Sequence, residues 1–520
     1  MEENRQIVKA ATVVGASTLL SRLAGLARDQ VMAYFFGTAS IAAAAFVVAF
    51  RIPNLLRRLL GEGALTVAFV PVFTQALAEG GKPAAAALFR NMFTLLALVL
   101  AVVSLAGVIA APHIVMLIAP GYIDSPELFD TTVLLTRILF PYIFFMGLGA
   151  LFMGALNSCG HFAAPALGPF VANLSMIAGT WILSSCFEQP IMGLVAGAMA
   201  GGALQLAIQI PSLIRSGLIP KPGFDFRSPA VKKILFLMGP AALGAAVYQL
   251  SVFINTILGS FLPEGSIPML YYADRLMQFP LGIFTMAIGT AALPALARQS
   301  AQGDQEGFIN SARFALGLAF FITIPAMVGL AVLAKPLVTF LFERGQFTAE
   351  STIGTASALT AYVLGLPFLS GAGILARIFY SRANTKTPTM VAMGSLAIGS
   401  VSALILMWPM QHVGLALASS ISSMVNFFWL YALVLVREKG FPQKEMFREI
   451  GSYFLLAIVM GAAVWPLGQW AENSIGFWPL ALKTLAAVAA GVLLYLVLAL
   501  ATRRPHVGPV WRLLKKTLGH

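Results

Sequence analysis

Charged residues are scarce in this chain of 520 residues, since Asp, Glu, Lys and Arg together make up 10% of it. Hydrophobic residues make up 59%, and the mean hydropathy is +0.87. A soluble globular domain carries about 25% charged residues, so this composition excludes an ordinary soluble protein. Cysteine is scarcer still. Cys159 and Cys186 fall at opposite ends of a predicted membrane span, so no disulfide is expected between them.

The sequence consists largely of long apolar runs. Runs of about 20 residues or more recur along the whole chain, each long enough to cross a hydrocarbon core of roughly 30 Å. The predicted fold class is therefore an all-α polytopic membrane protein, and no segment between the runs has room for a soluble catalytic domain. Fourteen spans are predicted, near residues 7–35, 39–75, 83–111, 130–156, 163–185, 190–214, 231–259, 266–297, 310–334, 351–380, 387–408, 412–436, 450–468 and 476–501.

The net charge of +13 follows the predicted topology. Lys and Arg concentrate in alternate connecting segments, as the positive-inside rule requires, which places both termini in the cytoplasm and argues against a nucleic-acid partner. The chain opens with Glu2 and Glu3, and no small-residue cleavage site follows the first span, so no cleavable signal is expected. The same basic segments are expected to attract anionic membrane lipids.

An internal repeat organises the chain at an offset of about 223 residues. The segment around Pro112 and Gly121 matches the segment around Pro336 and Gly345. Each copy contains an even number of spans, so both copies enter the membrane in the same direction. The predicted domains are a first six-span lobe at 1–220, a second six-span lobe at 221–440, and two further spans with a basic cytoplasmic tail at 441–520.

Five arginines stand out because they lie inside the first two predicted spans. Each would cost about 2.5–3.5 kcal/mol near the bilayer centre if it faced lipid, so they are expected to line an internal hydrated cavity. Arginine binds phosphate oxygens in pairs through its planar fork and stays charged when water is removed, which favours an anionic, diphosphate-bearing ligand. These residues are Arg22, Arg28, Arg51, Arg57 and Arg58.

Few acids accompany these arginines within the predicted spans. The second copy contributes one acid and one arginine within its spans. The positions of the second copy that correspond to the charged residues of the first copy hold uncharged residues. Two interpretations remain open at this point: a binding site with about three excess positive charges for a ligand, or buried ion pairs that hold the helices in register. The further residues of this candidate site are Asp29, Asn54, Glu62, Asp274 and Arg275.

Three segments carry a resemblance to a known family: SRLAGLARDQVMAYFFG, FRIPNLLRRLLGEGALTVAFVPVF and YYADRLMQFPLGIFTMAIGTAALP. Together with the span count, they resemble the MurJ/MviN family of lipid II flippases, in the MATE-like MOP exporter superfamily. The resemblance implies a bacterial inner-membrane protein of cell-wall biogenesis that moves the undecaprenyl-diphosphate-linked peptidoglycan precursor from the cytoplasmic to the periplasmic leaflet. It implies substrate-binding roles for Arg22, Arg28, Arg57 and Arg275, with Asp29 and Glu62 as acidic neighbours.

The resemblance has further implications, and the sequence departs from the family pattern at one position. It implies a membrane-facing groove for the isoprenoid tail in the last two spans, and cell-wall synthesis proteins as candidate partners. Ala44 stands where many relatives carry an acid. No acidic cluster in the second copy assigns ligands for a coupling ion, so the metal, the energy source and any cofactor stay unassigned.

Two alternatives compete with this interpretation. One is a flippase for another anionic lipid-linked oligosaccharide, or a MATE-like exporter; an exporter of organic cations would need an acidic cavity rather than a basic one. The other is an intramembrane enzyme, such as a polyprenyl-phosphate transferase. That activity requires a carboxylate cluster or a metal site near a membrane face, and the sequence has neither a paired-Asp motif nor a spaced His cluster. The expectation is a transporter.

Overall fold

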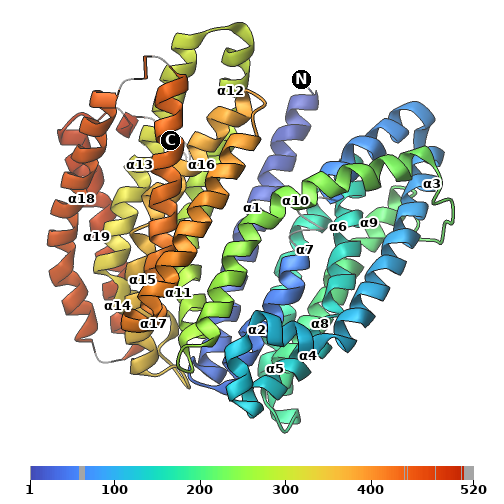
Figure 1. Cartoon of the computed structure of the whole chain (residues 1–520), viewed down its shortest axis with the longest axis horizontal. Helices are drawn as coiled ribbons and strands as arrows, with labels where there is room; N and C mark the ends of the chain where they lie inside the picture. The colour runs from blue at the N-terminus through green and yellow to red at the C-terminus, as the bar shows by residue number, and fades with distance from the viewer. Residues whose placement is uncertain are drawn as a thin grey trace. The chain divides into compact units, whose positions relative to one another are not determined.

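The structure is a computed structural model that describes residues 2–57, 65–438, 440–441, 443–474, 476–504 and 506–508. Every regular element within these ranges is a helix (Figure 1). Nine helical segments among them are long and apolar enough to cross a membrane. The predicted class of an all-α polytopic membrane protein is confirmed, while the count of fourteen spans stays a prediction.

The helices form two compact units, and the chain crosses between them more than once. Unit 1 comprises residues 1–267 together with the four residues Arg344–Phe347, and unit 2 comprises 268–343 and 348–520. Unit 1 contains α1 (Glu2–Phe36), α2 (Ile41–Arg57), α3 (Thr66–Ile109), α4 (Ala111–Ile118), η2 (Pro120–Asp124), α5 (Pro126–Leu139), α6 (Tyr142–Ser158), α7 (Ala163–Ala178), η3 (Gly179–Leu183), η4 (Ser184–Cys186), α8 (Ile191–Ala207), α9 (Ile210–Arg215) and α10 (Pro229–Ser260).

Unit 2 holds the remaining helices, apart from the first residues of α11. They are α11 (Ser266–Pro280), η5 (Leu281–Thr285), α12 (Met286–Gln302), α13 (Gln305–Val332), α14 (Ala334–Phe342), α15 (Ala349–Val363), α16 (Leu366–Ser381), α17 (Lys386–Arg437), α18 (Gln443–Glu472) and α19 (Phe477–Ala501).

Helix boundaries depart from the predicted spans at two long helices. α17 runs across two predicted spans, and the break between them falls at Gln411, whose backbone is left-handed (φ 50°). α3 contains a similar break at Gly81 (φ 65°), a conformation that glycine adopts without steric cost. Periodicity of apolar residues locates spans well, but it does not show whether consecutive spans share one helix.

In unit 1, small residues allow the closest helix packing. α1 packs on α7, and α7 packs on α8. A side chain at Gly193 would collide with the backbone of Ser184, and one at Gly197 would collide with the carbonyl oxygen of Ser175. Glycines at such positions let helix backbones approach directly, which is the usual source of helix association in lipid. α8 and α7 are therefore in close backbone contact, and α1 lies on α7.

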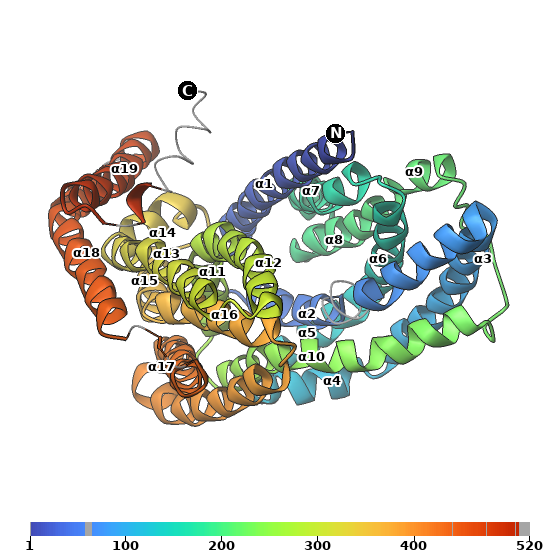
Figure 2. The same ribbon diagram turned by 90° about the horizontal axis from the view of Figure 1, so that it is seen from above.

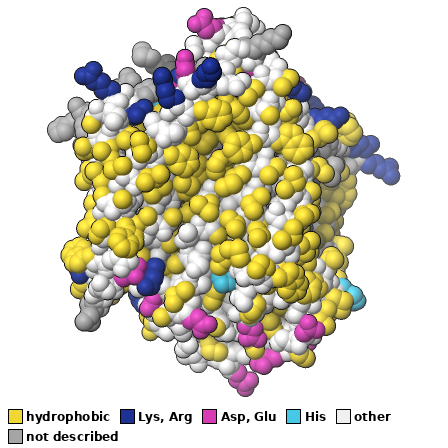
Figure 3. Space-filling model, turned by 60° about the vertical axis from the view of Figure 1, so that its left-hand side comes forward, with side chains coloured by type: hydrophobic (Ala, Val, Ile, Leu, Met, Phe, Trp, Pro, Cys, Tyr) yellow, Lys and Arg dark blue, Asp and Glu magenta, His cyan; other side chains and the backbone are white. Residues whose placement is uncertain are grey.

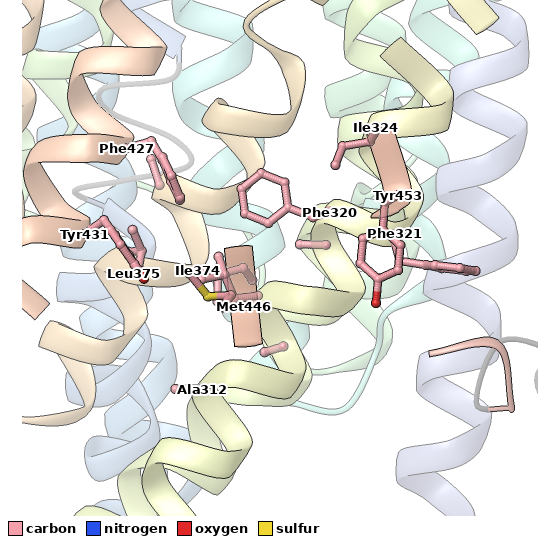
Figure 4. Close-up of a cluster of buried hydrophobic side chains, with 14 of the residues drawn as sticks. Ala312, Phe320, Phe321, Ile324, Ile374, Leu375, Phe427, Tyr431, Met446 and Tyr453 are labelled. Carbon is pink, nitrogen blue, oxygen red and sulfur yellow. The ribbon is translucent and has the colours of Figure 1, made fainter. Parts of the chain in front are cut away.

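Unit 2 packs around α13 through aromatic rings. α18 and α19 lie side by side against α13 (Figure 2). In the buried cluster of Figure 4, the ring of Phe321 meets Tyr453 of α18 edge-on at 5.4 Å, and Phe320 meets Phe427 of α17 at the same separation. Edge-to-face pairs of this kind add about 0.5–1.5 kcal/mol to area burial. The two helices that follow the repeat therefore share one core with the second copy.

The surface of one face carries its charges at the ends of the helices. In Figure 3 a broad belt of hydrophobic side chains separates an end where Lys and Arg gather from an end where Asp and Glu predominate. Large apolar side chains are highly exposed in this part of the chain, including Leu482 of α19 at 66% and Ile458 of α18 at 58%. Such a belt is what a bilayer core requires of a protein surface.

Candidate functional site

The predicted site residues come from three helices. α1 carries Arg22, Arg28 and Asp29; α2 carries Arg51 and Asn54; and α11 carries Asp274 and Arg275. The remaining predicted residues cannot be placed: Arg58 and Glu62 lie outside the described residues, and so does the side chain of Arg57. Ala44, on α2, is 3% exposed and packs within unit 1.

Arg28 and Asp29 form a buried ion pair within α1. The Arg28 Nη2 and Nε atoms donate to Asp29 Oδ1 at 2.5 and 3.1 Å. Arg28 is 8% exposed and Asp29 is 1% exposed. The pair is thus enclosed by protein, and in this conformation the prediction of a hydrated surround is wrong for Arg28. A buried charge is tolerated when a partner and further hydrogen bonds compensate it, and both are present here.

A second helix completes the environment of this ion pair. Arg28 Nη1 donates to Asn173 Oδ1 of α7 at 3.1 Å, and it lies 3.9 Å from the sulfur of Met176. The Asn173 amide nitrogen donates to the carbonyl oxygens of Pro169 at 2.9 Å and Ser21 at 3.3 Å. Asn173 therefore joins α7 to α1 at two points. Neither Asn173 nor Met176 stood out in the sequence, because one amide in an apolar helix carries no pattern.

Arg22 lies on the same helix as the ion pair but is less enclosed. It is partly exposed, whereas Arg28 and Asp29 are buried. The Asp29 carboxylate accepts hydrogen bonds from its neighbour Arg28. Arg22 thus has a more open position than Arg28.

Arg51 connects α2 to α10. Its Nη1 atom donates to Thr256 Oγ1 at 2.5 Å, and that hydroxyl donates in turn to the Val252 carbonyl at 2.6 Å. Arg51 also acts on Tyr122 in the short helix η2: burial raises the pKa of Tyr122, and the positive charge of Arg51 opposes that rise. α2 continues as a helix through Pro53 to Arg57.

In unit 2 the adjacent Asp274 and Arg275 contact different neighbours on α11. The Gln278 amide donates to the Asp274 carboxylate, while Arg275 Nη2 donates to the Tyr271 hydroxyl at 3.3 Å. The Arg275 guanidinium lies 5.2 Å from the centre of the Tyr271 ring, within the range of a cation–π contact. Both charged residues are partly exposed. Phosphate-binding chemistry is therefore available to Arg275.

Arg377 of α16 is a further cation inside unit 2. Its Nη1 atom donates to the Gly373 carbonyl at 2.8 Å. Its guanidinium lies directly over Gly289 of α12, where any side chain would overlap it. The glycine thus gives the planar group a flat backbone surface. Among the described residues, no group of three or more His, Cys, Asp or Glu side chains is arranged to hold a metal ion.

Comparisons with known proteins cover nearly the whole chain. A probable lipid II flippase MurJ of Vibrio cholerae serotype O1 is 36% identical over 506 residues, which is 96% of each chain. A solved structure of the lipid II flippase MurJ in an inward closed conformation superposes with a TM-score of 0.80 at 28% identity, over 95% of this chain and 99% of that one.

More distant structures share the fold alone. An inward-facing multidrug resistance MATE transporter of the MOP superfamily superposes with a TM-score of 0.68 at 15% identity, over 83% of this chain and 99% of its own. The family model described as lipid II flippase MurJ matches residues 32–496. With this match and full-length relatives at more than one third identity, the chain belongs to the MurJ family of lipid II flippases, which are transporters and not enzymes.

Proposed function

We propose that this chain is a lipid II flippase that moves the undecaprenyl-diphosphate-linked peptidoglycan precursor from the cytoplasmic to the periplasmic leaflet of the bacterial inner membrane. The observation that carries this proposal is the full-length similarity to relatives named as lipid II flippases. The cationic side chains described above supply a chemistry that suits a lipid diphosphate. A diphosphate needs guanidinium groups that remain charged after water is excluded.

The arginines have separate roles in this proposal. Arg22, Arg57 and Arg275 bind the diphosphate and the sugar headgroup, with Arg51, Arg58, Asn54 and Asp274 close to the path. Arg28 takes part by exchange: its bonds to Asp29 and Asn173 are charge-assisted, so a diphosphate can replace them without leaving the cation uncompensated. Glu62 stays an acidic neighbour of Arg57 and Arg58 in this scheme.

The transport cycle is proposed to be alternating access. One state admits the headgroup from the cytoplasm while the isoprenoid tail stays in lipid, and rocking of the two repeat copies then exposes the headgroup to the periplasm. The distribution of Lys and Arg along the sequence supports a cytoplasmic position for both termini. The domains of the cycle are the two lobes at 1–220 and 221–440, with 441–520 carrying the tail groove.

Transport is tested in proteoliposomes that contain the full-length chain and fluorescent lipid II. We expect labelled headgroup to cross the bilayer, and a strain depleted of its own lipid II flippase to grow when it expresses the chain. Arg275→Ala should abolish both effects. Arg298→Ala is the matched control, because Arg298 is an exposed arginine near the end of α12. Equal loss in both variants would reject the specific role of Arg275.

A second arm of this assay separates the proposed substrate from the alternative. Proteoliposomes containing an undecaprenyl-diphosphate oligosaccharide without the peptide should show slower translocation than those containing lipid II. Equal or faster movement of the peptide-free lipid would favour a general flippase of anionic lipid-linked oligosaccharides. Movement of neither lipid, in a chain that retains its helical content, would reject the proposed function.

A further inference from the structure

Arg377 of α16 has no acidic partner among the described residues, unlike two other arginines of unit 2. Arg313 bonds to two carboxylates, each at 2.5 Å, and Arg382 bonds to Glu438 at 2.6 Å. Within the described ranges Arg377 makes a single hydrogen bond, to the Gly373 carbonyl at 2.8 Å. A cation in a membrane-spanning segment ordinarily has a compensating partner or lines a path for a substrate or an ion. The positive charge of Arg377 therefore calls for an anion.

The Arg377 guanidinium points away from the nearer end of its helix. α16 ends at Ser381, about one turn beyond Arg377, whereas the carbonyl that accepts the hydrogen bond belongs to Gly373, about one turn in the other direction. An arginine that reaches for the membrane surface extends its charged group toward that surface, and hence toward the nearer helix end. The guanidinium is instead held along the body of the span.

Gly289 of α12 makes room for this guanidinium. Gly289 is buried, and a side chain there would overlap the Cζ, Nε and Nη2 atoms of Arg377. In the part of the chain that the structure describes, Nε and Nη2 have no hydrogen-bond acceptor. Arg377 itself is partly exposed. The guanidinium thus fits closely against the glycine backbone and remains open to a ligand on another side.

A hydroxyl pair fixes the two helical segments that form this position. Thr285, the last residue of η5, and Ser370 of α16 are both buried, and their hydroxyl oxygens lie 2.8 Å apart. Thr285 precedes Gly289 by about one helical turn, and Ser370 precedes Gly373 by about one turn. α12 also packs on α16. The guanidinium therefore lies between two held helices, which is the rigidity that a binding site requires.

We propose that Arg377 and Gly289 form an oxyanion-binding site in unit 2, at which a phosphate or carboxylate group of the lipid-linked substrate supplies the missing negative charge. The Nε and Nη2 atoms form one edge of the planar fork, and such an edge binds two oxygens side by side. Arginine also keeps its charge when water is excluded. This inference rests on the proposed flippase function and adds a substrate contact to those assigned above.

Substrate affinity tests the charge at this site. The measurement is the binding of fluorescent lipid II to the full-length chain in phosphatidylcholine nanodiscs. Arg377→Gln removes the charge but keeps an amide that can donate to the Gly373 carbonyl. We expect it to weaken binding about tenfold, as loss of one charge-assisted hydrogen bond predicts. Arg298→Gln, at an exposed arginine of α12, is the matched control and should bind as the parent does. Equal affinity in Arg377→Gln and the parent would overturn the site.

A stability measurement separates binding from packing and needs no substrate. No described carboxylate compensates the charge of Arg377, so its removal should leave the unfolding temperature of the chain unchanged or raise it. A residue that mainly held α12 against α16 would behave in the opposite way. A clear fall in the unfolding temperature of Arg377→Gln would therefore assign Arg377 a packing role and overturn the site.

A second comparison moves the guanidinium instead of removing its charge. Gly289→Ala should weaken lipid II binding, because the new side chain takes the place of the guanidinium. In the Arg377→Gln background the same change should have little further effect. Gly451→Ala is the matched control, since no atom lies within 4 Å of the added carbon on α18. If Gly289→Ala bound lipid II as tightly as Gly451→Ala does, the proposed geometry would be wrong.

Membrane phospholipid is the other source of a phosphate group, and phosphatidylglycerol added to the nanodiscs distinguishes it from the substrate. We expect the difference in lipid II affinity between the parent and Arg377→Gln to persist in its presence. If phosphatidylglycerol abolishes that difference, the site belongs to a phospholipid headgroup and the substrate assignment is overturned. A parent chain that binds no lipid II would reject the proposed function and this inference with it. A parent that binds and moves lipid II no better than Arg377→Gln does would reject the inference alone.

Discussion

Units 1 and 2 each contain an arginine directly beside an aspartate, and the two pairs behave differently. In unit 1, Arg28 and Asp29 bond to each other and are buried. In unit 2, Asp274 accepts from Gln278, and Arg275 donates to Tyr271. The two adjacent pairs therefore differ in their burial and in the neighbours that they contact.

The difference follows from what packs on each helix. α1 lies against α7, whose Asn173 and Met176 enclose the Arg28 guanidinium, and enclosure makes the carboxylate partner necessary. The charges on α11 are partly exposed, and their neighbours include the Gln278 amide and the Tyr271 ring. The Arg28–Asp29 pair thus contributes to helix packing, and Arg275 is the better position at which to test the proposed substrate binding.

The largest expected effect comes from removing the acid in unit 1. Asp29→Ala leaves the buried Arg28 guanidinium without its carboxylate, which should lower the free energy of unfolding by about 3–5 kcal/mol. Thermal unfolding in detergent measures this loss, together with the amount of protein accumulated in the membrane. Asp274→Ala is the comparison in unit 2 and should unfold near the parent temperature. Similar losses in both variants would remove the distinction between the two pairs.

A smaller effect separates charge from geometry. Arg28→Lys keeps the positive charge but cannot span Asp29 and Asn173 together, so about 1.5–3 kcal/mol of stability should be lost with one charge-assisted hydrogen bond. Arg275→Lys should leave the unfolding temperature unchanged and instead weaken binding of a lipid diphosphate about tenfold, since a single ammonium replaces a planar fork. Unimpaired diphosphate binding by Arg275→Lys would indicate diffuse electrostatic attraction at that position.

The amide that joins α7 to α1 should matter less than the ion pair. Asn173→Ala removes the bonds to Arg28 and to the Ser21 carbonyl but leaves the Asp29 partner, so we expect a loss of about 1–2 kcal/mol. A double-mutant cycle with Arg28→Lys measures how much of that loss passes through Arg28. Strictly additive losses would show that Asn173 acts on α1 through Ser21 alone.

The smallest expected effect is in unit 2. Tyr271→Phe removes the hydroxyl that accepts from Arg275 and keeps the ring beneath the guanidinium, so stability should change by about 0.5–1 kcal/mol or less. Transport of lipid II should persist at a reduced rate. Tyr271→Ala removes the ring as well and tests the remaining cation–π contact. A transport loss in Tyr271→Phe as large as that in Arg275→Ala would mean that the hydroxyl itself contacts the substrate.

A topology test also follows from the structure. The predicted orientation is checked by introducing a cysteine near Gly121, but Gly121 cannot carry a side chain beside Ser260. Asp124, three residues later, is exposed and is the better position. In a chain without its native cysteines, Asp124→Cys should react with an impermeant reagent added outside intact spheroplasts, whereas Lys386→Cys should not. The reverse pattern would invert the proposed orientation.

Composition and periodicity were enough to predict the membrane class and the helical fold, whereas the family was predicted from the resemblance of three sequence segments. These properties depend on averages over many residues, because a bilayer imposes the same apolar requirement on every span. The segments around Arg22 and Arg275 carried the family resemblance without any knowledge of their contacts. The repeat was also visible in the sequence, since Gly121 and Gly345 occupy corresponding places in it.

Tertiary structure decided what individual residues contact. Asn173 lies far from Arg28 along the chain, and a lone amide in an apolar helix gives no sign of its partner. In the same way, the sequence marks Gly345 as a loop glycine, but it does not show that the Tyr34 carbonyl fills the space a side chain would need. Periodicity reports which face of a helix is apolar, whereas a single hydrogen bond or a close backbone approach depends on where a distant segment comes to lie.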